Sequence, residues 1–250
     1  MKKHLFSFLI ILSISVSAQD LIAAKDGDIK ITPILHGTLV IEYQDLVYYV
    51  DPYGGAKVFE GQPKPNFVLI TDIHGDHYNP ETIAALDLTD TWLIAPQAVK
   101  DKMTPEMQEK TVVLNNGDSE EAYFDMACKI TALPMYNLPE TDDSRHPKGR
   151  GNGYILELGG KRIYISGDTE DIPEMRKLKK IDVAFVCMNL PYTMGIDQAA
   201  SAVSEFQPKI VYPYHYRGTE GLSDVAQFKA MVNKTAPKVD VRLRAWYPEK

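Results

Sequence analysis

The sequence predicts an α+β fold in which two β-sheets pack face to face and helices cover their outer faces. Short segments rich in β-branched and aromatic residues recur along both halves of the chain, and each half continues into segments with helical patterns. Strands followed by helices, twice over in one continuous chain of 250 residues, are typical of a sandwich of two sheets between helical layers.

The first half is dominated by strand signals. A meander of three strands is expected at residues 29–32, 39–43 and 46–50, with turn-forming residues between them. The apolar run at residues 66–71 is short and continuous, as in a strand buried on both faces. A helix should follow it, because Asn79 can cap the helix and Pro80 suits its first turn. Further strands are expected at residues 92–95, 111–114, 122–124 and 129–133, and a short helix at residues 98–103.

The second half repeats this order. Residues 154–158 and 162–166 form a predicted hairpin across two glycines. Helices are expected at residues 172–178 and 197–206, the second of them capped by Asp197. Strands are expected at residues 183–188 and 210–213, and the longest irregular segment is the Pro- and Gly-rich stretch at residues 134–153.

The first 18 residues have the three parts of a secretory signal peptide. Lys2 and Lys3 give a basic start, an apolar stretch follows, and small residues precede a cleavage position after Ala18. The apolar stretch is shorter than the roughly 20 residues of a membrane-spanning helix, so we expect cleavage rather than an uncleaved anchor. The sequence therefore predicts a periplasmic or secreted protein, with one domain at residues 19–250 and no stable membrane insertion after cleavage.

The composition indicates an acidic globular protein. Loss of residues 1–18 would leave 25 basic against 34 acidic residues and a net charge of −9. This charge argues against nucleic acid as a partner, so we expect a small-molecule substrate; the oligomeric state is not indicated. Cys128 and Cys187 leave two alternatives open, a disulfide in an oxidising compartment or two buried thiols in apolar runs.

The segment at residues 71–77, TDIHGDH, carries the strongest chemical signal. It contains four potential metal ligands and lies between the buried strand and the capped helix. In an extended backbone Asp72 and His74 point to the same side, and Asp76 and His77 can then turn toward a second ion. Imidazole and carboxylate ligands together suit zinc, iron or manganese.

This segment resembles the signature of the metallo-β-lactamase fold, whose usual form is His-x-His-x-Asp-His, except that Asp72 replaces the first histidine. The resemblance spans about residues 29–216 and implies a four-layer αββα sandwich of the metallo-β-lactamase type. It also implies ligands from distant loops, which occur in the family's order as His146, Asp168 and His215.

The resemblance implies a complete ligand set when it is carried over residue by residue. The first metal ion would be held by Asp72, His74 and His146, the second by Asp76, His77 and His215, and Asp168 would bridge the two. Within the superfamily the chain is most similar to the L-ascorbate-6-phosphate lactonase-like branch. That similarity is carried by residues 51–52 (DP), 134–137 (PMYN), 151–154 (GNGY) and 167–170 (GDTE).

Asp72 changes the expected charge of the centre. A carboxylate in place of a neutral imidazole makes a core of two divalent ions, three aspartates and a hydroxide neutral instead of positive. The additional oxygen ligand also favours manganese or iron over zinc. We expect two divalent ions as cofactors, zinc or manganese with iron as a further option; the alternative is that only the second site binds tightly.

The resemblance implies a metal-dependent hydrolase in which a metal-bound hydroxide attacks an ester, lactone or phosphodiester bond. Asp76 and Asp168 are the expected catalytic residues. Candidates for contacting the substrate and donating to a developing negative charge are Tyr136, Asn137, Asn152 and Tyr192. Arginines that could hold an anionic substrate are Arg145, Arg150 and Arg217. His36 is expected to be structural or to line the pocket.

Two other classes of function remain open. A di-iron redox enzyme on this fold would consume oxygen or nitric oxide. A non-catalytic metal-binding protein would load metal and yet be inert to hydrolysable substrates. Every ligand position of the signature is retained in some form, which favours the hydrolase.

Overall fold

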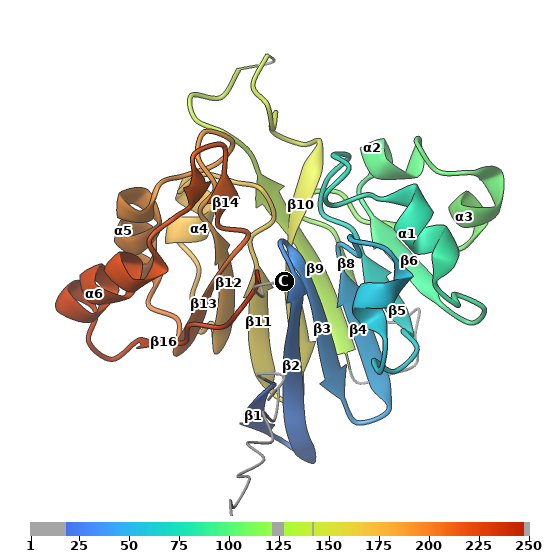
Figure 1. Ribbon diagram of the computed structural model, residues 1–250, viewed down its shortest axis with the longest axis horizontal. Helices are drawn as coiled ribbons and strands as arrows, with labels where there is room; N and C mark the ends of the chain where they lie inside the picture. The colour runs from blue at the N-terminus through green and yellow to red at the C-terminus, as the bar shows by residue number, and fades with distance from the viewer. Residues whose placement is uncertain (1–18, 122–127, 142, 248–250) are drawn as a thin grey trace, which may run out of the picture.

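Two seven-stranded β-sheets form the centre of the molecule (Figure 1). The structure is a computed structural model that describes residues 19–121, 128–141 and 143–247. The signal peptide expected at residues 1–18 and the strand expected at residues 122–124 lie outside the described residues. Within those residues no helix is long and apolar enough to span a membrane.

The first sheet contains its strands in the order of the chain. They are β1 (Asp20–Ala24), β2 (Gly27–Leu35), β3 (Thr38–Tyr43), β4 (Leu46–Val50), β5 (Phe67–Leu69), β6 (Trp92–Ala95) and β7 (Thr111–Val113). The strands from β1 to β4 are paired antiparallel, and those from β4 to β7 are paired parallel. The antiparallel part is the predicted meander, extended by the edge strand β1.

The second sheet also joins antiparallel and parallel strands. Its order is β16 (Asp240–Val241), β13 (Ile210–Tyr214), β12 (Val183–Cys187), β11 (Lys161–Ile165), β10 (Gly151–Leu158), β9 (Cys128–Met135) and β8 (Ser119–Glu120). The pairs β11–β12, β12–β13 and β13–β16 are parallel. A separate small hairpin consists of β14 (Arg217–Gly218) and β15 (Gly221–Leu222).

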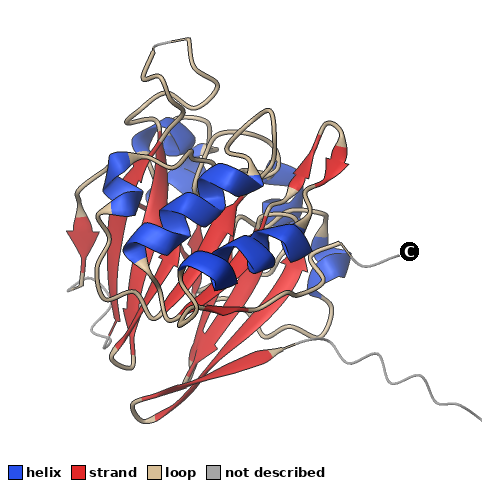
Figure 2. Ribbon diagram, turned by 90° about the vertical axis from the view of Figure 1, so that its left-hand side faces the viewer, coloured by secondary structure: helices blue, strands red, loops and turns tan. Residues whose placement is uncertain are grey.

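Helices lie on the outer faces of both sheets (Figures 1 and 2). The first sheet is accompanied by η1 (Ala56–Phe59), α1 (Pro80–Ala85), α2 (Gln97–Lys100) and α3 (Pro105–Glu109), and the second by α4 (Pro173–Arg176), α5 (Ile196–Phe206) and α6 (Val225–Thr235). The predicted four-layer αββα sandwich is therefore confirmed. Asn79 caps α1 as predicted, its side chain accepting from the Thr82 N–H at 2.8 Å.

The start of α5 differs from the prediction. Gly195, and not Asp197, is the N-cap residue, and Asp197 lies within the first turn. The Gln198 side chain closes this helix end by accepting from the Gly195 N–H at 3.1 Å. Asp197 still lies where a negative charge favours the helix dipole.

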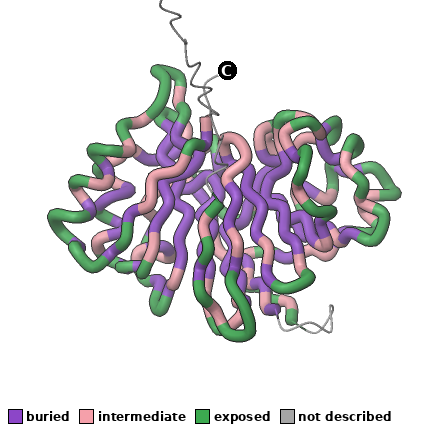
Figure 3. Tube along the Cα trace, turned by 60° about the horizontal axis from the view of Figure 1, so that its bottom comes forward, coloured by how far each residue is buried: buried purple, intermediate pink, exposed green. Residues whose placement is uncertain are grey.

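The hydrophobic core follows the alternation of the strands, whose residues are mostly buried (Figure 3). In β3, Leu39 and Ile41 belong to the cluster that also contains Tyr154 of the second sheet. Val40 points to the opposite face and joins a second cluster with Ile83 of α1. The first sheet thus buries both faces at β3, and in the second sheet β12 is buried along its whole length. Cys128 and Cys187 are both buried free thiols, so the disulfide alternative is not adopted.

The parallel strand pairs place the loops that follow β5, β11 and β13 at the same end of the sandwich. The carboxyl ends of parallel neighbours lie at one edge of a sheet, and β5, β11 and β13 each have a parallel neighbour. The segment at residues 72–77 follows β5, Asp168 follows β11, and His215 follows β13. Residues that are far apart in the chain therefore converge at one end of the sandwich.

Candidate metal centre

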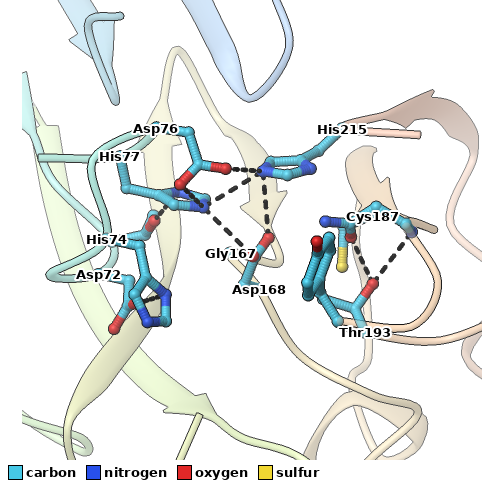
Figure 4. A network of polar contacts seen from close by, with 12 residues as sticks. Asp72, His74, Asp76, His77, Gly167, Asp168, Cys187, Thr193 and His215 are labelled. Atoms are coloured by element: carbon cyan, nitrogen blue, oxygen red, sulfur yellow. Dashed lines mark hydrogen bonds and ion pairs between the residues drawn. The ribbon is translucent and has the colours of Figure 1, made fainter. Parts of the chain in front are cut away.

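The predicted metal ligands converge on one place, and Figure 4 labels all of them except His146. Four separate segments supply them: residues 72–77, the loop between β9 and β10 with His146, and the residues that directly follow β11 and β13. The structure places six of them in two groups whose ligand atoms lie within 4.8 Å of one another, and it places Asp76 in a third such group with His36 and His215.

The first group consists of Asp72, His74 and His146. His74 Nδ1 lies 2.6 Å from Asp72 Oδ2, and His146 Nε2 lies 4.0 Å from the same oxygen. Asp72 and His146 are fully buried, whereas the side chain of His74 is 28% exposed. These are the three residues that the sequence assigns to the first ion, and His146 belongs to the group although it lies in a polar loop.

The second group contains His77, Asp168 and His215, with Asp76 beside it. His77 Nε2 and His215 Nε2 face one another at 3.2 Å. Asp76 Oδ2 lies 3.4 Å from His215 Nε2, and the Asp76 side chain, at 34% exposure, is the most accessible of these four. The predicted second set of Asp76, His77 and His215 therefore lies close together, with Asp76 at its edge, 3.9 Å from His77 Nε2.

Asp168 contacts both groups through one buried carboxylate. Its Oδ2 lies 3.3 Å from His77 Nε2 and 3.4 Å from His146 Nε2, while Oδ1 lies 3.4 Å from His215 Nε2. The side chain is only 5% exposed. This is the position that a carboxylate bridging two cations requires.

The geometry fits metal ions. Ligands at about 2.0–2.1 Å from a tetrahedral ion are about 3.3 Å apart, which matches the spacing of 3.2–3.4 Å in the second group. Within the described part of the chain, His146 Nε2 and Asp168 Oδ1 are buried without a hydrogen-bond partner. Buried polar atoms are normally paired, and a cation between these atoms would satisfy them.

Asp51 orients His77 from behind. It is fully buried and follows β4; its Oδ1 accepts from the Thr71 N–H at 2.7 Å. Its Oδ2 accepts from the Thr71 hydroxyl at 2.6 Å and from His77 Nδ1 at 2.8 Å. Because a carboxylate only accepts, Nδ1 of His77 carries a proton, and Nε2 is the nitrogen that can bind a metal ion once its own proton has left.

Asn137 orients the imidazole ring of His146. Its Oδ1 accepts from the His146 N–H at 2.8 Å and faces His146 Nδ1 at 3.0 Å. Its amide nitrogen donates to the Tyr192 carbonyl at 2.9 Å. Nε2 of His146 is therefore left free for the centre. The amide of Asn137, a predicted substrate contact, is thus engaged by His146 and Tyr192.

Arg150 pairs with the carboxylate that replaces the first histidine. Its Nε and Nη2 lie 3.2 Å from Asp72 Oδ1 and Oδ2 respectively, and Nη2 also donates to the Arg145 carbonyl. The side chain is 21% exposed beside a fully buried Asp72. The positive charge of Arg150 offsets the additional negative charge of Asp72. With two divalent ions bound, the centre would therefore have the positive charge expected of the histidine form.

The charges in the centre favour the ionised form of Asp168 and the protonated form of His77. Burial alone would raise the pKa of Asp168, but the neighbouring His215 and His77 hold it well below its usual value. Burial alone would lower the pKa of His77, but Asp168 and Asp51 raise it well above its usual value. In the metal-free protein His77 therefore retains a proton that a metal ion must displace.

The other three predicted substrate-binding residues, Tyr136, Asn152 and Tyr192, differ in their burial and contacts. Asn152 lies in the interior instead of the pocket, because it is fully buried and its amide donates to the Leu114 carbonyl at 2.6 Å. The Tyr136 hydroxyl is used by Glu174, to which it donates at 2.8 Å. Tyr192 remains partly accessible.

Two of the three arginines considered for an anionic substrate lie over aromatic rings. Arg145 lies over the Tyr192 ring and Arg217 over the Tyr247 ring, each 4.2 Å from the centroid. The third, Arg150, donates hydrogen bonds to both carboxylate oxygens of Asp72.

Sequence reasoning gave no role in this centre to Asp51 and Tyr247, and it expected only a structural or pocket-lining role for His36. Asp51 was noted only in a family segment, and Tyr247 was not considered. His36 donates toward Asp76, with 3.2 Å between Nε2 and Oδ2, and its Nδ1 lies 2.5 Å from the Tyr247 hydroxyl. Only contacts across 26, 40 and 211 positions reveal these roles, so no local signal could have indicated them.

Replacement of Arg150 by methionine should destabilise the metal-free protein by about 2 kcal/mol at pH 7, because the buried Asp72 carboxylate loses its two guanidinium hydrogen bonds and keeps only His74 as a close charged partner. The measurement is urea unfolding in the presence of a chelator. R217M is the matched control and should cost about 1 kcal/mol at most, since it removes a cation–π contact. The double variant D72N/R150M should recover most of the loss. Equal losses in R150M and R217M would contradict the assignment.

Metal binding should release protons near neutral pH. His77 has a raised pKa in the metal-free protein, so affinity should increase with pH until that pKa is passed. Titration calorimetry with Zn²⁺ at pH 7, in two buffers of different ionisation enthalpy, counts the protons. Asp51→Asn removes one of the two carboxylates that raise this pKa and should reduce the release. Proton uptake on binding would refute the protonation state.

The comparisons with known proteins agree with this geometry. Residues 30–215 match the Beta-lactamase superfamily domain. A UPF0173 metal-dependent hydrolase of Staphylococcus saprophyticus is 30% identical over 212 residues, which cover 79% of this chain and 91% of that protein. A relative of the same name from Nanoarchaeum equitans is 29% identical over 192 residues, covering 75% of this chain and 83% of that protein.

A solved structure of another metal-dependent hydrolase is also similar to this chain. A Parabacteroides distasonis protein named as a metal-dependent hydrolase is 41% identical, covers 90% of this chain and 97% of its own, and superposes with a TM-score of 0.78. The chain therefore belongs to the metallo-β-lactamase superfamily and, within it, to the UPF0173 metal-dependent hydrolase family.

Proposed function

We propose that this metal-dependent hydrolase cleaves an ester, lactone or phosphodiester bond in a small molecule, with two divalent ions as cofactors. The observation that carries the proposal is the Asp168 carboxylate, whose Oδ2 contacts one histidine of each ligand group at 3.3 and 3.4 Å. Two ions bound there would supply an activated water and polarise the oxygen of the bond under attack.

The protein's own residues have distinct roles in this proposal. The first group is enclosed, since Asp72 and His146 are fully buried, and it serves to fix its ion. Asp76 is 34% exposed and lies at the open side, where its carboxylate can accept a hydrogen bond from the attacking water and orient it. Asp168 holds the two groups at a constant separation.

The metal preference follows from the donor atoms. Asp72 supplies oxygen where the usual signature supplies nitrogen, and oxygen donors favour manganese or iron. Arg150 offsets the charge of Asp72 but does not change the donor type. We therefore propose manganese or iron in the first site and leave zinc as the alternative, which metal analysis of native protein distinguishes.

The reaction should be found by assaying chromogenic esters, lactones, phosphodiesters and β-lactams, with manganese, zinc and iron in turn. Asp76→Asn should lower kcat at least 100-fold on the active substrate, because it removes a carboxylate that orients the nucleophile. Asp197→Asn, an exposed aspartate in the first turn of α5, is the matched control and should leave kcat unchanged.

Each outcome of this panel has a clear meaning. Turnover of lactones above the other classes would support the likeness to the lactonase-like branch. Unchanged turnover in Asp76→Asn would refute the proposed role. Metal-loaded protein that is inert to every class would favour a binding protein, and oxygen consumption by iron-loaded protein would favour a redox enzyme.

We also propose that the protein is exported. The support is the basic, apolar and small-residue order of residues 1–18. Expression of the full chain in a bacterial host should give a periplasmic product whose N-terminal residue, measured by mass spectrometry, is Gln19. A cytoplasmic product that keeps residues 1–18 would contradict export.

A further inference from the structure

His36 lies in the turn between β2 and β3, beside the candidate metal centre. Its backbone φ is 59°, in the left-handed region that favours glycine. The next residue, Gly37, does not have a left-handed φ. The chain therefore has a histidine, not a glycine, at the position where a side chain is strained, and such strain is found mainly where a side chain has a function.

The turn is held against His215. The His36 carbonyl accepts from the His215 N–H at 3.1 Å, and the two imidazole rings are 3.8 Å apart between centroids. A Cβ on Gly37 would approach His215 Cδ2 to 2.9 Å, so only glycine allows this contact. The His36 ring is thereby fixed at the edge of the second ligand group, with a side chain that is 14% exposed.

The hydrogen bonds assign the tautomer of His36. Asp76 Oδ2 can only accept, so His36 Nε2, at 3.2 Å, carries the proton. Nδ1 then accepts from the Tyr247 hydroxyl at 2.5 Å. The Tyr247 oxygen in turn accepts from the Arg217 N–H at 3.2 Å. This continuous chain of donors runs from the backbone of β14 to the carboxylate.

Asp76 needs such a partner more than the other acidic residues of the centre. Its side chain is 34% exposed, compared with 0% for Asp72 and 5% for Asp168. Its Oδ1 is as far as 3.9 Å from His77 Nε2. Its Oδ2 also lies 3.4 Å from His215 Nε2, but that nitrogen would be taken up by a bound metal ion. Without the His36 donor on Oδ2, the carboxylate could then rotate into solvent.

We infer that His36 is a positioning residue, which Tyr247 holds in the Nε2-protonated form and which orients Asp76 toward the second metal site. The inference deepens the proposed hydrolase function and rests on it for its catalytic meaning. The competing role, in which His36 itself binds the metal, has geometric support because His36, Asp76 and His215 also form a possible ligand group. The experiment must separate the two.

Two replacements of His36, by glutamine and by asparagine, should rank in opposite order for a folding role and for a positioning role. Glutamine places an amide donor about where Nε2 lies and can still donate to Asp76. Asparagine is too short to do so, but it tolerates the left-handed φ better than glutamine. If His36 matters only for folding, H36N should be the better variant. If it positions Asp76, H36Q should be the better variant for metal binding.

The readout is the dissociation constant of Mn²⁺ for the second site, measured by competition with a chelator on the full protein without substrate. We expect H36N to weaken binding about tenfold, the usual effect of losing a partner of a metal ligand, and H36Q to stay within about threefold of wild type. Y247F should weaken binding to a smaller extent. Thermal unfolding of the metal-free variants should rank H36N at or above H36Q.

A double variant tests whether the effect passes through Asp76. In the D76N background, H36N should cause no further loss of affinity. A further loss there, or a change in the visible spectrum of Co²⁺-loaded H36Q, would identify His36 as a direct ligand and overturn the inference. Equal affinities of H36Q and H36N would overturn it as well. Because no substrate is used, failure of the hydrolase proposal in the substrate panel is a separate result.

Discussion

The structure depends on the burial of one carboxylate among three imidazoles. The Asp168 side chain is 5% exposed and lies 3.3–3.4 Å from His77, His146 and His215. Burial of an unpaired charge is strongly unfavourable, so the fold tolerates Asp168 only where positive charge surrounds it. The ends of β11 and β13 and the loop after β9 are therefore tied to the segment that follows β5.

The exchange at Asp72 shows how a distant residue compensates for a change in a signature motif. Arg150 lies 78 positions away and engages both carboxylate oxygens at 3.2 Å. A centre with this pair has the charge expected of the histidine form, but it keeps an oxygen donor in place of nitrogen. Position 72 can therefore change the chemistry of the first site without leaving an unpaired charge in the interior.

The ligands differ in how firmly their surroundings hold them. His77 is fixed by Asp51 and His146 by Asn137, both through the ring nitrogen that faces away from the centre. Asp76 is more exposed, and its support comes from the turn at His36. The ligands that are held on two sides therefore lie in the interior, and the Asp76 carboxylate lies at the solvent-exposed side of the centre.

The sequence by itself determined the sandwich of two sheets, the capped helix after residue 79, and the ligand types, because these follow from local periodicity, capping residues and a short motif. It missed α6, although Phe228 and Val232 form a buried pair at helical spacing. Only the tertiary structure decided that Asn152 is interior, that Arg150 neutralises Asp72, and that Asp51 and His36 support the centre. These roles depend on contacts between residues 26 to 78 positions apart, and no local pattern encodes which distant side chains will meet.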